Sequence, residues 1–80
     1  MIIYIDIDET ICVTPASRDY KLSSPIKDNI EKANKLYDSG NTIVYWTARG
    51  ATTGIDWHEV TKSQLIKWGV KFHELKMGKP

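Results

Sequence analysis

Residues 1–10 read MIIYIDIDET, an apolar run that leads directly into two aspartates, Asp6 and Asp8. Residues 2–5 and Ile7 are β-branched or aromatic, which is typical of a strand buried on both faces of a parallel sheet. Regular strand geometry would direct the two carboxylates to the same side. Carboxylates that close repel each other unless a cation or a shared proton relieves them. Because open α/β sheets bind ligands at the carboxyl ends of central strands, we expect that cation to be Mg²⁺.

The following segments alternate between helical and strand periodicity. Ser23-Ser24-Pro25 predicts a helix start, with a serine cap and a proline in the first turn, and Gly40 can end that helix in a left-handed conformation. Residues 42–46 predict a second strand, residues 57–68 a second helix capped by Asp56, and residues 70–75 a third strand. This order predicts a single α/β domain over residues 1–80, a Rossmann-like fold with a short parallel sheet of about three strands, right-handed crossovers and two flanking helices.

Residues 11–24 break this alternation and predict a loop, because turn formers are concentrated there. The loop is too short for a separate cap domain. Cys12 is the only cysteine, and no histidine lies near it in the sequence. A lone cysteine is usually a small buried hydrophobic residue, so we interpret Cys12 in that way rather than as a nucleophile.

Composition restricts the partners of the chain. Hydrophobic residues make up 41% and charged residues 26% of the sequence, with a net charge of +1, as in soluble globular proteins. The basic residues are spread out, so nothing favours nucleic acid or an anionic membrane. No apolar stretch approaches the ~20 residues of a membrane span, the N-terminus does not read as a signal peptide, and one cysteine gives no disulfide framework. We therefore expect a cytoplasmic protein.

Polar groups follow the second and third predicted strands as well. Thr47-Ala48-Arg49-Gly50 follows the second strand, and it brings a hydroxyl and backbone N–H groups, which are hydrogen-bond donors, to that edge. Arg49 could bind a phosphate or another substrate anion, or form a surface salt bridge, and the sequence leaves both open. Lys76 and Lys79 follow the third strand. His73 has no companion at metal-ligand spacing, which favours a structural or solvent role.

Taken together, these segments resemble the motifs of the haloacid dehalogenase (HAD) superfamily, mostly Mg²⁺-dependent phosphohydrolases. Residues 6–10, DIDET, are similar to its DxDx[TV] signature, Thr47 falls where its second motif ends a strand, and residues 78–80, GKP, are similar to its third motif. The chain looks most like the small capless phosphatases, including those of capsule or surface-polysaccharide biosynthesis, which carry similar DIDxTIC, TARG, GIDW and GKP segments. Glu9 replaces a glycine common in that subgroup.

The resemblance implies a mechanism with an aspartyl-phosphate intermediate. Asp6 would attack phosphorus, and Asp8 would protonate the leaving oxygen and later deprotonate the hydrolytic water. Thr47 and Lys79 would hold the phosphoryl oxygens, with Lys76 as the alternative lysine. Mg²⁺ would be bound by Asp6 and Asp8, the latter through its backbone carbonyl. The substrate would be a phosphomonoester such as a sugar phosphate or a phosphorylated polymer end. The implied substrate-binding residues are Thr10, Ala48, Arg49 and Gly50.

The fourth motif of the family has no counterpart before Pro80. In the family it is a further strand beside the first, with acidic residues that complete the metal site. Without it, Mg²⁺ has fewer protein ligands and the edge of the most apolar strand is exposed, so we expect a homo-oligomer that covers this edge. A second hypothesis is a catalytically weak or inactive HAD-like binding or assembly module. A receiver-type phosphoacceptor domain fits less well, because its acidic pair and its phosphoacceptor lie on different strands.

Overall fold

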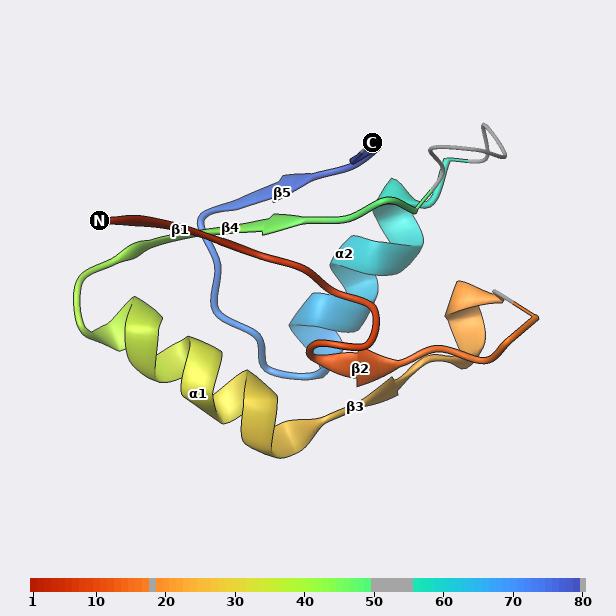
Figure 1. Cartoon of the computed structure of the whole chain (residues 1–80), viewed down its shortest axis with the longest axis horizontal. Helices are drawn as coiled ribbons and strands as arrows, with labels where there is room; N and C mark the ends of the chain where they lie inside the picture. Colours follow the sequence, from red (N-terminus) through yellow and green to blue (C-terminus); the bar gives the residue numbers. More distant parts are fainter. Residues whose placement is uncertain (18, 50–55, 80) are drawn as a thin grey trace.

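The computed structural model describes residues 1–17, 19–49 and 56–79. Within these ranges the chain forms an α/β domain with a three-stranded parallel sheet and a two-stranded antiparallel ribbon (Figure 1), which confirms the predicted fold class. In chain order the elements are β1 (Ile2–Ile5), β2 (Cys12–Val13), the 3-10 helix η1 (Tyr20–Leu22), β3 (Ser24–Pro25), α1 (Lys27–Asp38), β4 (Thr42–Trp46), α2 (His58–Lys67) and β5 (Glu74–Lys76).

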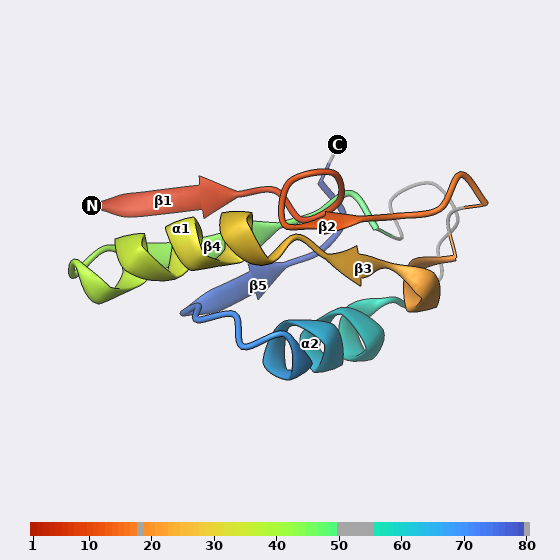
Figure 2. The same cartoon turned by 90° about the horizontal axis from the view of Figure 1, so that it is seen from below.

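The strand order β1-β4-β5 places both helices on one face of the sheet. β4 is parallel to both neighbours, with Ile2 opposite Thr42 and Val44 opposite Glu74. Each crossover moves one strand further in the same direction, and right-handed crossovers of that kind put their helices on the same side. Figures 1 and 2 show α1 and α2 on this common side. Neither helix in the described ranges has the length and apolar character that crossing a bilayer requires.

The core lies between the sheet and the two helices. Its buried members are Ile7, Ile11, Cys12, Ile30, Ala33, Ile43, Tyr45, Leu65 and Val70. Cys12 is fully buried among them, which confirms that it packs as a small hydrophobic residue. Ile43 and Tyr45 of β4 belong to this core and therefore face the helices. They are two residues apart, as the two-residue period of a strand requires.

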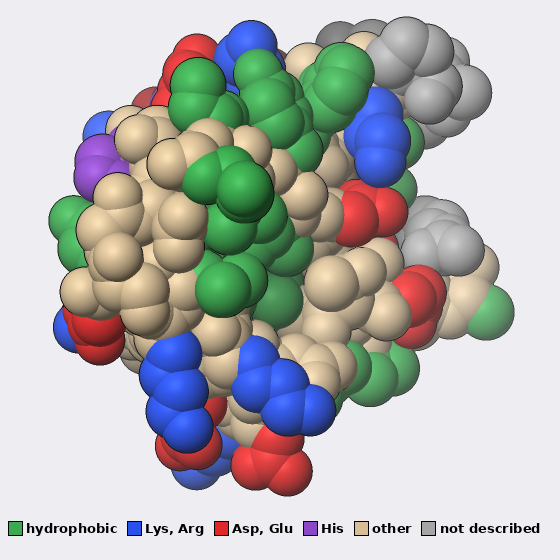
Figure 3. Space-filling view, turned by 60° about the vertical axis from the view of Figure 1, so that its left-hand side comes forward, with side chains coloured by type: hydrophobic (Ala, Val, Ile, Leu, Met, Phe, Trp, Pro, Cys, Tyr) green, Lys and Arg blue, Asp and Glu red, His purple; other side chains and the backbone are tan. Residues whose placement is uncertain are grey.

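β1 is an edge strand of the described sheet and is buried on one face only. The prediction that both its faces are buried is therefore wrong. It pairs with β4 on one side, and Ile2 and Tyr4 are 62% and 52% exposed, whereas Ile3 and Ile5 pack against the core. The physical reason is that helices cover only one face. Leu36 of α1 is also exposed. Figure 3, in which the left-hand side of Figure 1 with the N-terminus comes forward, shows hydrophobic side chains gathered on this face of the molecule.

The serine–proline start predicted for α1 is also wrong. Ser24 and Pro25 form β3 and pair with β2, so residues 11–24 contain more regular structure than the predicted loop. The N-cap is Ile26, which makes no side-chain cap hydrogen bond, and its N–H donates to the Ile11 carbonyl at 2.8 Å. Strand pairing thus overrides the local capping signal. At the other end, Gly40 has φ +95°, which confirms the predicted left-handed glycine.

The second half of the chain follows the prediction with small shifts. α2 begins at His58 with Trp57 in the N-cap position, and Asp56 still accepts the His58 backbone N–H at 3.0 Å. β5 spans Glu74–Lys76 rather than residues 70–75. Just before it, His73 donates its N–H to the Ile43 carbonyl at 2.9 Å and accepts the Ile43 N–H at Nδ1, at 3.0 Å. His73 therefore has the structural role that its spacing favoured.

Candidate functional site

The predicted site residues lie where the parallel strands end, the edge at which such sheets bind ligands. Two backbone hydrogen bonds bring the C-terminal segment to this edge. The Thr47 N–H donates to the Lys76 carbonyl at 3.0 Å, and the Lys79 N–H donates to the Thr47 carbonyl at 2.9 Å. They extend the pairing of β4 and β5 beyond both strands and carry Lys79 towards the end of β1.

Asp6 and Lys79 form an accessible ion pair at this edge. Lys79 Nζ lies 3.8 Å from Asp6 Oδ2, with side chains 39% and 46% exposed. The other Asp6 oxygen accepts the Ile7 N–H at 2.8 Å, which orients the carboxylate. Lys76 instead places its ammonium 5.6 Å from the centre of the Tyr4 ring. Of the two candidate lysines, Lys79 is therefore the one beside Asp6.

Asp8 has a different environment from Asp6. Its Oδ1 accepts hydrogen bonds from Arg49 Nη2 at 2.8 Å and from Thr14 Oγ1, and its Oδ2 accepts one from Arg49 Nε at 3.1 Å. Burial alone would raise the pKa of Asp8. The hydrogen bonds from Arg49 and Thr14, together with the arginine charge, outweigh that effect and hold this pKa below its ordinary value. Asp8 is therefore held as a carboxylate.

Arg49 is the residue that joins this site to the rest of the fold. It is 1% exposed and is the largest fully buried side chain of the described residues. Its Nη1 donates to Thr61 Oγ1 at 3.0 Å and to Gln64 Oε1 at 2.7 Å on α2, and its guanidinium lies 4.5 Å from the Tyr20 ring centre in η1. Of the two alternatives left open for Arg49, the ion pair is present, but it is buried rather than on the surface.

The remaining predicted residues surround these pairs. Thr47 is fully buried and its Oγ1 accepts the Arg49 N–H at 3.2 Å, whereas Ala48 is exposed. The Thr10 carbonyl accepts a hydrogen bond from Asn29 Nδ2 at 2.8 Å, which fixes the turn after Asp8 to α1. Gly50, predicted to bind substrate, lies outside the described residues, as does Pro80.

The turn after Asp8 has a backbone conformation that bears on position 9, where the sequence resemblance leads us to expect glycine. Glu9 has φ +62°, a left-handed conformation that costs a non-glycine residue roughly 1–2 kcal/mol and glycine almost nothing. A glycine at this position would therefore suit the backbone. Glu9 nevertheless adopts the same turn, with its N–H donating to the Cys12 carbonyl at 2.8 Å.

The oxygen donors at this edge fit a Mg²⁺ ion that takes most of its ligands from water and substrate. Mg²⁺ commonly binds one or two carboxylates and completes its shell with waters and phosphate oxygens. Asp6 offers an accessible carboxylate, whereas the Asp8 side chain is engaged by Arg49. The resemblance assigns the backbone carbonyl of Asp8, not its side chain, to the ion. Within the described ranges, no three His, Cys, Asp or Glu side chains gather into a fuller ligand set.

Burial excludes Cys12 as a nucleophile at this site. Its Sγ lies 3.6 Å from Asp8 Oδ1 and 3.8 Å from Arg49 Nη2. Burial first, and then the negative charge of Asp8, raise the pKa of the Cys12 thiol. Since a thiolate rather than a thiol attacks, the sulfur serves as packing.

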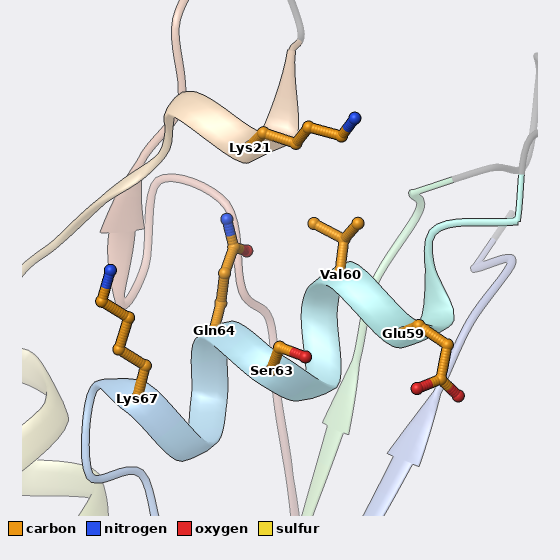
Figure 4. Close-up of a pocket in the computed structure, with 6 residues that line it drawn as sticks. All are labelled: Lys21, Glu59, Val60, Ser63, Gln64 and Lys67. Carbon is orange, nitrogen blue, oxygen red and sulfur yellow. The ribbon is translucent and has the colours of Figure 1, made fainter.

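A separate groove of about 400 Å³ lies between η1 and α2 (Figure 4). Val60 and Gln64 point from α2 towards η1, and Lys21 extends over them, whereas Glu59 points away. Gln64 connects the groove to the site, because its Nε2 donates to the Tyr20 carbonyl while its Oε1 accepts from Arg49. Sequence reasoning missed the Asp8 partner Thr14 and the Arg49 partners Thr61 and Gln64, since no local pattern marks a residue that supports a distant side chain.

The architecture of this chain is also found in a known crystal structure. The chain is similar to a crystal structure of a structural genomics target from Vibrio cholerae, with a TM-score of 0.87 and 27% sequence identity over 99% of this chain and 70% of that chain. No family model matches the sequence, and no curated protein is significantly similar to it. The name of the Vibrio cholerae protein states no activity. The likeness therefore supports the fold of this chain, and any activity has to be argued from the residues of the site.

Proposed function

We propose that this chain is a Mg²⁺-dependent phosphohydrolase of the HAD type, which cleaves a phosphomonoester through an aspartyl-phosphate at Asp6. The observation that carries the proposal is the pair of Asp6 and Lys79, 3.8 Å apart at the carboxyl edge of the sheet. It combines an accessible carboxylate, able to act as a nucleophile, with a cation that attracts a phosphoryl dianion. Asp8, two residues on, supplies a second carboxylate in a different environment.

The roles of the residues follow from their surroundings. Asp6 attacks phosphorus and expels the leaving oxygen, while the Lys79 ammonium binds the phosphoryl oxygens. A water molecule then attacks the same phosphorus, passes a proton to the Asp8 carboxylate and releases phosphate from Asp6. Mg²⁺, held by Asp6 and the Asp8 carbonyl, would offset negative charge on the phosphoryl oxygens.

Two observations favour the second candidate, an inactive HAD-like binding or assembly module. Thr47, which the sequence resemblance assigns to the phosphoryl group, is fully buried, with its oxygen taken up by the Arg49 N–H. The Asp8 side chain is likewise engaged by Arg49. Neither residue needs to contact a substrate to stabilise the fold, so a module without catalysis would keep both contacts.

Phosphate release separates the two candidates. The chain and its Asp6→Ala variant are incubated with an aryl phosphate, in Mg²⁺ and in excess chelator, with folding verified by circular dichroism. The phosphohydrolase predicts release that requires both Mg²⁺ and Asp6. The binding module is favoured if the folded chain releases no phosphate, or if the Asp6→Ala variant releases as much as the wild-type chain.

We propose that the chain is cytoplasmic and that it forms a homo-oligomer; the exposed edge of β1 supports the second of these. Ile2 and Tyr4 present apolar surface beside the side of β1 that no strand of the described residues pairs with, and such edges tend to pair with another chain. Sedimentation at micromolar concentration tests this, and a monomer there contradicts it.

A further inference from the structure

Two aromatic rings and two lysines form a continuous strip on the face of the sheet that points away from α1 and α2 (Figure 1). The Tyr4 and Trp46 rings meet edge to face, with their centres 5.7 Å apart. Lys76 Nζ lies 5.6 Å from the centre of the Tyr4 ring, and Lys79 Nζ lies 5.8 Å from the centre of the Trp46 ring. We call these four residues the aromatic strip.

The alternation of side chains along the strands explains why the rings lie on this face. Ile5 and Tyr45 pack in the core, so their neighbours Tyr4 and Trp46 point to the opposite side of the sheet. Val44 also points to that side, yet it is only 3% exposed. The longer side chains around Val44 therefore lie over the sheet rather than project into solvent, and they form a platform.

The aromatic strip begins at the proposed catalytic pair, because Lys79 belongs to both. Its ammonium lies 3.8 Å from Asp6 Oδ2. Tyr4 is 52% exposed, so solvent reaches the rings as well as the pair. A phosphoryl group bound beside Lys79 would therefore have an aromatic surface within reach of its leaving group. Exposed apolar surface of this kind is typical of ligand and interaction sites.

The rings hold the two ammonium groups only weakly. Both ammonium-to-ring distances are close to the ~6 Å limit of a cation–π contact, and such contacts contribute little at exposed sites. Within the described residues, Lys76 has the Tyr4 ring as its partner and no carboxylate at ion-pair distance. An anion is a stronger partner than a ring, so an incoming anionic group would draw the ammonium away and leave the ring free to stack.

The charges on this face limit where an anionic group can bind. Leu75 packs against the core, so Glu74 and Lys76 point to the same face as the rings. By the register of β5, Lys76 lies opposite Trp46 and nearer the carboxyl edge than Glu74. Lys76 attracts an anion to the half of the face near the catalytic pair, and Glu74 repels it from the other half.

We infer that the aromatic strip is the subsite for the leaving group, and that the substrate is a phosphomonoester with an aromatic ring and a second anionic group. The phosphoryl group binds beside Lys79, and the ring stacks on Trp46 and Tyr4. The second anionic group pairs with Lys76. A saturated sugar ring has no π face with which to stack in this way. The inference rests on the proposed phosphohydrolase function and narrows its substrate.

Binding of phosphonates, which cannot be hydrolysed, tests the subsite without turnover. The probes are benzylphosphonate, para-carboxybenzylphosphonate and cyclohexylmethylphosphonate, each titrated in Mg²⁺ and followed by nitrogen-15 NMR. We expect the benzyl probe to bind roughly fivefold more tightly than the cyclohexylmethyl probe, because only an aromatic ring stacks. The carboxyl group should add about threefold, a gain that salt reduces. Equal affinities of the three probes overturn the inference.

The indole N–H signals of the tryptophans locate the bound probe. The chain has three tryptophans, and of these Trp46 lies in the aromatic strip, whereas Trp68 is the C-cap residue of α2. We expect the Trp46 signal to shift with the benzyl probe and the Trp68 signal to stay in place. Shifts at Trp57 or Trp68 without one at Trp46 place the probe elsewhere and overturn the inference.

Variants of the rings test the stacking. Trp46→Leu should remove most of the preference for the benzyl over the cyclohexylmethyl probe, and Trp46→Phe should restore it. Tyr4→Leu changes an exposed side chain and serves where Trp46→Leu does not fold. Trp68→Leu, at another half-buried tryptophan, is the matched control and should keep the preference. A preference that survives both Trp46→Leu and Tyr4→Leu overturns the inference.

Variants of the lysines test the second anionic group. Lys76→Met should reduce the advantage of the carboxybenzyl over the benzyl probe to nearly none. Lys71→Met removes an exposed lysine that pairs with Asp38, and this matched control should keep the advantage. Equal effects of the two variants show that the carboxyl group senses overall charge rather than Lys76, and they overturn the inference.

Phosphate release distinguishes a failure of the subsite from a failure of the proposed function. Phenyl phosphate and para-carboxyphenyl phosphate serve as substrates for the wild-type chain and for Asp6→Ala. If release does not depend on Asp6, the proposed function fails, and the inference fails with it. If release depends on Asp6 but the three phosphonates bind equally, the proposed function stands and only the inference fails.

Discussion

Two ion pairs in this protein have the same separation but different burial, which allows the effect of burial to be measured. Arg49 Nη2 and Asp8 Oδ1 are 2.8 Å apart, with side chains 0% and 16% exposed. Lys71 Nζ and Asp38 Oδ1 are also 2.8 Å apart, with side chains 50% and 56% exposed. We predict that Arg49→Met lowers the free energy of unfolding much more than Lys71→Met.

The expected losses in the free energy of unfolding follow from the charge that each variant leaves without its partner. Removing one partner of a buried pair costs about 3–5 kcal/mol, because the remaining charge is buried without compensation. Asp8 keeps some contact with solvent, so we expect Arg49→Met to fall near 3 kcal/mol, at the lower end of that range. An exposed pair contributes about 0.2–1 kcal/mol, which is the expected effect of Lys71→Met.

Urea unfolding at neutral pH, followed by tryptophan fluorescence, measures both effects. A domain of 80 residues has a total stability of about 4–12 kcal/mol, so the milder Arg49→Lys serves if Arg49→Met is unfolded in buffer. Added salt should reduce the effect of Lys71→Met more than that of Arg49→Met, since exposed charges are screened more. Equal costs for the two Met variants would refute the reasoning from burial.

The pair of Arg49 and Asp8 also predicts that the free energy of unfolding depends on pH. The pKa of Asp8 is lowered in the folded protein, so the stabilisation is present above the ordinary value of 3.8 and is lost as pH falls below it. The difference between wild type and Arg49→Met should therefore shrink in acid. A difference that stays constant from pH 7 to pH 3 would contradict this linkage.

Further predictions concern Tyr45, the two lysines of the C-terminal segment, and Cys12. Tyr45 Oη is buried without a hydrogen-bond partner in the described residues, and burial raises its pKa to about 12, so Tyr45→Phe should raise the free energy of unfolding by about 1 kcal/mol. Wild type should also lose roughly 2–3 kcal/mol of stability between about pH 10 and 12, which Tyr45→Phe avoids, as alkaline urea melts would show. Lys79→Met should reduce phosphate release at least tenfold and Lys76→Met less than twofold, and equal losses would contradict the assignment of Lys79. Cys12 should react with a thiol reagent at the rate of global unfolding, whereas fast labelling of native protein would show that the sulfur is accessible.

The sequence predicted the elements whose local pattern agrees with their packing. Residues 42–46 form β4 as predicted, because an unbroken β-branched and aromatic run suits a strand with neighbours on both sides. The alternation of strands and helices predicted a parallel sheet, and the sheet has that form. Gly40 marked the end of α1 because few other residues take a left-handed conformation readily.

The errors arise where distant parts of the chain decide local structure. Ser24 and Pro25 carry the signal of a helix start, yet pairing with Cys12 and Val13 makes them a strand. The run at residues 2–5 is apolar throughout, yet Ile2 and Tyr4 are exposed because the helices cover one face of the sheet. Periodicity records the hydrophobic character of a segment and not which elements lie against it.

The candidate site was likewise predicted only in part from the sequence. The pattern of residues 6–10 marked both aspartates, and the geometry separates them into an accessible Asp6 beside Lys79 and an enclosed Asp8 beside Arg49. That separation depends on tertiary contacts of Arg49 with Thr61 and Gln64, which lie 12 and 15 residues away in the sequence. Roles that depend on burial therefore came from the structure and not from the motif.

Trapping the covalent intermediate tests the central claim, that Asp6 is the nucleophile, most directly. The chain is mixed with an acyl phosphate or an aryl phosphate in Mg²⁺, quenched in acid within milliseconds to seconds, digested and analysed by mass spectrometry. We predict one phosphoryl group on the peptide that contains Asp6, located on Asp6 and absent from the Asp6→Asn variant. Phosphorylation of Asp8 or of another residue, or phosphate release with no labelled peptide at any quench time, would contradict it.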